Sequence, residues 1–196
     1  IQVIKEYLAP IVLGNDWTPD GVHAAMKVVR GHHIARASVG TAVLDVWLRR
    51  ASTSLGDYLG ATRAEVDCGV SVGIPTSESI EDLLEEVGMY VDAGYRRIKL
   101  KIEPGWDIEP VAVVRERWPT IPLQVDANQA YSREHAHHLA RLDEFDLLLI
   151  EQPLEEEDWW GHTLTARACS TPIRLDESLQ ATAQAEAAVE NGAGTH

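Results

Sequence analysis

The segment RRIKLKIEPGWD, residues 96–107, has the composition of a buried β-strand but carries two lysines, at positions 99 and 101. Successive side chains of a strand point to opposite faces, so Lys99 and Lys101 are predicted to share a face, with Leu100 on the other. Burying two ammonium groups side by side is costly unless anionic groups lie opposite them. The segment therefore predicts a strand whose lysines face acidic partners from elsewhere in the chain.

Five segments of the chain, including this one, have the short apolar or β-branched runs that are typical of strands. They are VDCGVSVGI (66–74), RIKLKI (97–102), IPLQVDA (121–127), LLLIEQP (147–153) and PIRLDES (172–178). Stretches with helical periodicity lie between and after them, over residues 83–91, 107–118, 132–142, 158–169 and 182–191. Because strands and helices alternate at a regular spacing, the pattern predicts a parallel sheet and an α/β fold with five βα units.

Each of the last three predicted strands ends in an acidic residue, and Asp126, Glu151 and Asp176 are separated by 25 residues in both intervals. The carboxyl ends of parallel strands open on one face, so we expect these side chains to lie around one point. A single acid at a strand end is usually a helix cap or a surface ion pair, but three at matched spacing would repel one another unless a cation neutralised them. Oxygen ligands favour Mg²⁺, with Mn²⁺ as the alternative.

The two lysines precede these acids on the neighbouring predicted strand, at the same rim of the sheet. A lysine crowded by a second lysine and a divalent cation is favoured in its neutral form, which can accept a proton. Lys101 lies nearer the carboxyl end of the strand and is predicted to be the catalytic base, while Lys99 tunes and orients it. The alternative is that one of the two simply extends into solvent as a surface residue.

The first part of the chain has a different pattern. Helical periodicity at about 19–29 and 34–51 occurs without intervening strands. We expect residues 1–62 to be helical material of a separate capping or flanking domain, and residues 63–196 to hold the βα units.

Charge and composition restrict the class of partner. The 196 residues include 31 acidic and 17 basic ones, for a net charge of −14, which argues against nucleic acid or an anionic membrane as a partner. The longest strongly apolar run, LLLI at 147–150, is far too short to span a bilayer. Two cysteines without metal-ligand spacing indicate reduced thiols and a cytoplasmic protein.

Taken in order and spacing, these motifs resemble the enolase superfamily, in its muconate-lactonizing subgroup. The motifs are the K-x-K of Lys99 and Lys101, Asp126 with Asn128, Glu151-Gln152-Pro153, and Asp176-Glu177-Ser178. Within that subgroup, GYRRIKLKIEPGWD (94–107) and QVDANQAY (124–131) are most similar to o-succinylbenzoate synthases and N-acylamino acid racemases. The likeness extends over essentially the whole chain.

The resemblance implies a capped (β/α) barrel in which Asp126, Glu151 and Asp176 hold a divalent ion that binds the substrate carboxylate. Lys101 would abstract the proton α to that carboxylate, with stabilisation of the enediolate. A synthase would then complete a dehydration in menaquinone biosynthesis, and a racemase would return the proton from the opposite face.

The resemblance also implies roles for residues around the ligands. Asn128 and Glu177 would lie beside them. Ser71, on the first barrel strand, would contact the substrate, unless it is a plain buried serine. The substrate would be a small carboxylate, and the protein a homo-oligomer. The alternatives within the subgroup are a dipeptide epimerase and a muconate cycloisomerase; outside it, the alternative is a non-catalytic metal-binding fragment.

One part of the family pattern is not in this sequence. The second catalytic lysine belongs on a sixth strand, whereas the sequence ends at His196, 20 residues after Asp176. We therefore expect residues 63–196 to form strands one to five of a partial barrel, either as part of a longer protein or as a real fragment. A real fragment would leave an open sheet edge after the fifth strand, where another chain could pair. Whether such a chain is active by itself stays open.

Overall fold

In the computed structural model, which describes residues 1–194, the predicted strands form one sheet in the order β1-β2-β3-β4-β5. The strands are β1 (Gly69–Val72), β2 (Arg97–Lys101), β3 (Leu123–Asp126), β4 (Ile150–Glu151) and β5 (Ile173–Arg174). Every neighbouring pair is parallel. The α/β fold with five βα units is therefore confirmed.

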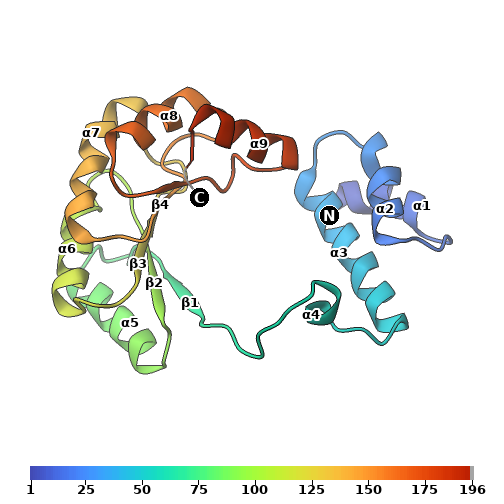
Figure 1. Ribbon diagram of the computed structural model, residues 1–196, viewed down its shortest axis with the longest axis horizontal. Coiled ribbons are helices and arrows are strands. Elements are labelled where there is room, and N and C mark those ends of the chain that lie inside the picture. The colour runs from blue at the N-terminus through green and yellow to red at the C-terminus, as the bar shows by residue number, and fades with distance from the viewer. Residues whose placement is uncertain (195–196) are drawn as a thin grey trace. The chain divides into compact units, whose positions relative to one another are not determined.

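Helices follow the strands and cover one side of the sheet, as Figure 1 shows for α5 to α8. Their bounds are α5 (Ile80–Asp92), α6 (Ile108–Arg117), α7 (Ala136–Leu139), α8 (Trp159–Ala168) and α9 (Thr182–Asn191). The third predicted helix is mostly 3₁₀, because η3 (Arg133–His135) and η4 (Ala140–Phe145) flank a single α-helical turn. Within residues 1–194, no helix combines the length and the apolarity needed to cross a bilayer.

Alternation along β2 sends apolar and basic side chains to different sides of the sheet. Ile98 and Leu100 are buried in the core that the sheet shares with the helices, together with residues such as Val111 and Val114 of α6. Burial of each such side chain contributes about 1.5–3 kcal/mol. The core therefore holds β2 in the register that leaves its lysines on the opposite face.

The chain divides into two compact units, Ile1–Val66 and Asp67–His196. The first is helical, with α2 (Pro19–Ala25), η2 (Met26–Val28) and α3 (His33–Arg50) at the predicted places. Three short helical elements lie outside the two predicted helical stretches: η1 (Ile4–Leu8) and α1 (Ala9–Val12) precede them, and α4 (Leu55–Tyr58) follows them. Leu8, Val22 and Met26 form its buried core. Its assignment as a capping domain stays a prediction.

Candidate functional site

The acidic residues of β3 and β4 end their strands side by side. β3 ends at Asp126 and β4 at Glu151, and the sheet register pairs Lys101 with Asp126, Asp126 with Glu151, and Glu151 with Arg174. Side chains of paired residues in parallel strands lie on the same face. Asp176 departs from the predicted arrangement, because β5 ends at Arg174 and Asp176 lies in the segment that follows it.

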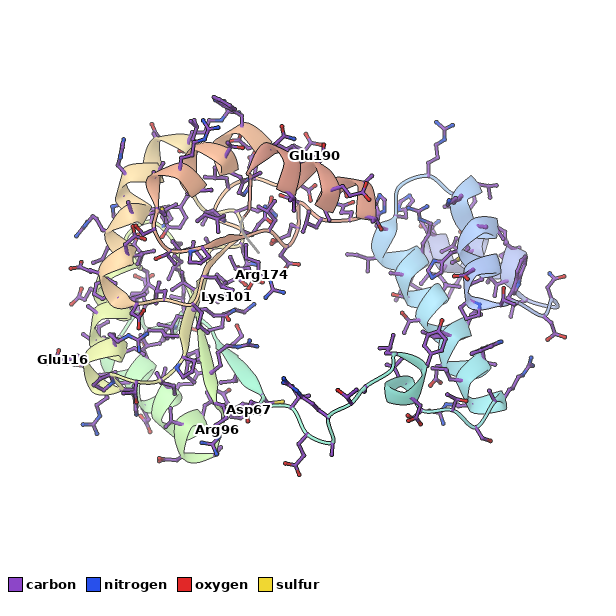
Figure 2. All side chains as sticks on the ribbon, in the orientation of Figure 1. Asp67, Arg96, Lys101, Glu116, Arg174 and Glu190 are labelled. Carbon is purple, nitrogen blue, oxygen red and sulfur yellow. The ribbon has the colours of Figure 1, made fainter. Side chains whose placement is uncertain are left out.

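Both lysines of β2 converge on Asp126. Lys99 Nζ lies 3.0 Å from Asp126 Oδ2 and 3.3 Å from Glu151 Oε1, and Lys101 Nζ lies 2.6 Å from Asp126 Oδ2. Lys101 Nζ also donates a hydrogen bond to Asn128 Oδ1. Figure 2 shows Lys101 on the side of the sheet away from the helices. The two lysines thus share a face, as strand alternation predicts, and the anionic groups opposite them are Asp126 and Glu151.

Burial and pairing act in opposite directions on the charges of this cluster. Asp126 is only 2% exposed, and burial raises its pKa, but hydrogen bonds from Lys101, Lys99 and the Asn128 N–H outweigh burial and hold the pKa below its ordinary value. Burial lowers the pKa of Lys99, but the hydrogen bonds and charges of Asp126 and Glu151 outweigh it and raise the pKa. Lys99 is therefore an ammonium ion held by two carboxylates.

Asn128 connects this cluster to the segment after β5. Its N–H donates to Asp126 Oδ1 at 3.0 Å, and its Nδ2 donates to Glu177 Oε1 at 3.1 Å. Glu177 Oε2 is buried and has no hydrogen-bond partner in the described part of the chain. Asn128 and Glu177 thus lie beside the charged cluster, where the resemblance places them.

Asp176 and Ser71 are less closely connected to the cluster. The Asp176 side chain is exposed, and no group of three His, Cys, Asp or Glu side chains within residues 1–194 is arranged to hold a metal ion. Asp126 and Glu151 are therefore brought together without Asp176. Ser71 is paired with Lys99 in the register and is exposed, so it is not a buried serine.

The donor set still fits a hard divalent cation in part. Asp126 and Glu151 present buried carboxylate oxygens that already accept from a positive charge, that of Lys99. Glu177 Oε2, which has no hydrogen-bond partner among residues 1–194, is a further carboxyl oxygen on the segment that carries Asp176. These are the ligand types that Mg²⁺ and Mn²⁺ prefer. Asp126 and Glu151 could hold such an ion, and Asp176 as the third ligand stays a prediction.

Two further residues on the same face are not among the predicted site residues. Gln124 is buried, and its Nε2 donates to Glu151 Oε2 at 3.3 Å. Arg174 is exposed, is paired with Glu151 in the register, and lies on the same side of the sheet as Lys101 in Figure 2. Both stand two positions before a predicted ligand, Asp126 or Asp176, so strand alternation alone could have placed them on this face.

Comparisons with known proteins agree with these features. The chain is 51% identical to an N-succinylamino acid racemase of Amycolatopsis sp over 98% of this chain and 52% of the relative. It is 37% identical to an o-succinylbenzoate synthase of Enterococcus faecalis over 97% of this chain and 52% of that relative. The chain spans about half the length of the curated relatives it matches.

A solved structure and a family profile agree with these relatives. The crystal structure of a racemase from Streptomyces coelicolor, described with bound magnesium, superposes with a TM-score of 0.89 at 26% identity and covers 99% of this chain and 58% of that one. The sequence profile of a family described as Enolase C-terminal domain-like matches residues 82–195. The resemblance to the enolase superfamily is thereby confirmed. The chain belongs to the Enolase C-terminal domain-like family.

Proposed function

We propose that this chain is part of an enzyme that removes the proton α to a carboxylate, acting as an o-succinylbenzoate synthase, an N-acylamino acid racemase or both. The observation that carries the proposal is the convergence of Lys99 and Lys101 on Asp126 beside Glu151, at the carboxyl ends of adjacent parallel strands. Relatives named for both activities support it. Family membership further supports a cytoplasmic, homo-oligomeric enzyme for a small carboxylate substrate, without a nucleic-acid or membrane partner.

Each residue of the cluster has a stated task in this proposal. Lys101 takes the α-proton as the neutral amine and becomes the ammonium ion, since Nζ is at the open end of β2 and its partners Asp126 and Asn128 hold it in place. Lys99 remains an ammonium ion and faces the negative charge that develops as the proton leaves. Glu151 holds Lys99 on its other side and is itself held by Gln124.

A divalent cation, held by Asp126, Glu151 and Asp176, would neutralise the substrate carboxylate and the charge of the enediolate when bound. The residues of this chain bind and orient that cation, and Lys101 moves the proton. Ser71, exposed beside Lys99 in the register, would contact the substrate.

The experiment is exchange of the α-proton in deuterated water. The purified chain is incubated with Mg²⁺ and an N-succinylamino acid, and loss of the α-proton signal is followed by ¹H NMR. We expect exchange that Lys101→Ala abolishes and that the matched control Lys27→Ala, a change at an exposed lysine of the helical unit, leaves unchanged.

Absence of exchange at high protein and Mg²⁺ concentrations would refute the proposal for this chain and favour a non-catalytic metal-binding fragment. Parallel incubation with a dipeptide and with muconate tests the epimerase and cycloisomerase alternatives. Exchange with the dipeptide alone, or lactonization of muconate alone, would replace the synthase or racemase assignment.

A further inference from the structure

We propose that Gln152 is a positioning residue that sets the main chain of the Asp176 segment relative to Glu151. It follows Glu151 directly at the end of β4 and is completely buried. The inference deepens the proposed function and rests on it for the role of Asp176 as a cation ligand. It is argued from the buried side-chain amide of Gln152, which forms hydrogen bonds to the segment that contains Asp176, the third predicted ligand.

Both the oxygen and the nitrogen of the Gln152 side-chain amide form hydrogen bonds. Its Oε1 accepts hydrogen bonds from the N–H of Asp176 at 2.7 Å and the N–H of Ser178 at 3.3 Å. Its Nε2 donates to Ser178 Oγ at 2.7 Å and to the carbonyl oxygen of Leu154 at 3.0 Å. Backbone N–H groups only donate and carbonyl oxygens only accept, so these partners fix which end of the amide is which.

The backbone of Gln152 joins the neighbouring strand ends as well. Its N–H donates to the Arg174 carbonyl at 2.8 Å, and its carbonyl accepts from the Gln129 N–H at 2.8 Å. Gln152 also has a positive φ of 37°, in the left-handed region that L-residues seldom adopt. A conformation of this kind persists only where the surrounding contacts hold it. Gln152, which directly follows Glu151, is thus hydrogen-bonded to the segment after Asp126 and to the segment before Asp176.

Within residues 1–194, the carboxylate of Asp176 has no comparable anchor of its own. Its side chain is exposed, whereas the N–H of the same residue is held by Gln152. Since β5 ends two residues earlier, at Arg174, sheet pairing does not extend to Asp176. The distance from Glu151 to the Asp176 main chain therefore depends on the Gln152 amide, and with it the separation of two carboxylates that a shared cation would need to bridge.

The test uses Gln152→Met, which keeps the length of the side chain and removes its polar atoms, in the same 196-residue chain. Amide exchange of Asp176 and Ser178 is measured by NMR, and Mn²⁺ affinity by electron paramagnetic resonance. We expect both amides to exchange about 10-fold faster or more, and the Kd for Mn²⁺ to rise about 10-fold or more. The matched control is Thr165→Val, which removes the buried hydrogen bond from Thr165 Oγ1 to the Gly161 carbonyl in α8 and should change neither quantity.

A double variant separates positioning from general destabilisation. If Gln152 acts through Asp176, its effect on the Kd should shrink to about two-fold or less once Asp176→Asn has removed the carboxylate. Gln152→Glu retains an oxygen that can accept from the N–H groups of Asp176 and Ser178, so it should keep the Asp176 amide protected from exchange. This second variant tests the inference even if Gln152→Met does not fold.

Three results would overturn the inference: unchanged amide exchange in Gln152→Met, loss of protection in Gln152→Glu, or an undiminished Kd effect in the double variant. If the unchanged chain binds no Mn²⁺, the ligand role in the proposed function is refuted, whereas the exchange rates still decide whether Gln152 positions the segment.

Discussion

The pairing of Lys99 with Asp126 predicts that burial, rather than distance, decides the strength of an ion pair in this chain. The two atoms lie 3.0 Å apart, with side chains 24% and 2% exposed. Arg49 and Asp45 form a shorter pair, at 2.8 Å, but their side chains are 78% and 59% exposed. Both pairs occur in one protein, so they can be measured under identical conditions.

Removing one partner of a buried pair costs about 3–5 kcal/mol. Asp126→Asn removes the carboxylate that both lysines contact, but Lys99 keeps Glu151 at 3.3 Å, Lys101 keeps Asn128, and both lysines are partly exposed. We therefore expect a loss nearer about 2 kcal/mol. The coupling energy between Lys99→Met and Asp126→Asn should then be about 1–2 kcal/mol. For Arg49→Met and Asp45→Asn, an exposed i,i+4 pair, a clearly smaller coupling energy is expected.

The assay is a double-mutant cycle by urea unfolding at pH 7, followed by NMR signals of the unit that carries each pair. The two units are followed separately, because a chain with two compact units need not unfold in one transition. Raising the salt concentration should weaken the exposed pair much more than the buried one. A coupling energy for Arg49 and Asp45 equal to or above that for Lys99 and Asp126 would refute the reasoning.

Three further predictions concern the stability of the second unit. Burial lowers the pKa of His162 despite the opposing effect of Asp158, so the unfolded state binds the proton more readily. The free energy of unfolding should therefore fall as the pH drops below about 6.5. His162→Gln should remove that pH dependence in urea titrations from pH 7 to 5. Arg115 donates to four backbone carbonyls, at 2.8, 3.2, 2.8 and 3.0 Å, so Arg115→Met should lower the free energy of unfolding by about 2–4 kcal/mol. The control Arg117→Met, at an exposed arginine of the same helix, should change the urea unfolding midpoint little. Equal losses of stability in the two variants would contradict a stabilising role for the Arg115 hydrogen bonds. Tyr131→Phe removes the 2.9 Å hydrogen bond to the buried Asp107 carboxylate and should cost about 1–3 kcal/mol in thermal or urea unfolding, whereas no loss would mean that the bond adds nothing.

Local periodicity was sufficient for most of the fold. The alternation of Ile98, Lys99, Leu100 and Lys101 predicts which side chains enter the core and which share the opposite face, because the geometry of a strand leaves no other choice. The alternation of strands and helices likewise predicts the parallel sheet. Local periodicity did not distinguish an α-helix from the 3₁₀ turns around α7, and it did not show that β5 ends at Arg174.

The candidate site divides in the same way. The sequence by itself determined that Lys99 and Lys101 need anionic partners and that strand-end acids are those partners, since both follow from alternation and from the cost of burying charge. Only the tertiary structure decided that both lysines converge on Asp126, that the exposed Asp176 forms no three-ligand cluster among residues 1–194, and that Gln152 holds its main chain. Those contacts depend on register and on the course of the segments after each strand, which are set by hydrogen bonds between residues about 25 positions apart and not by any local pattern.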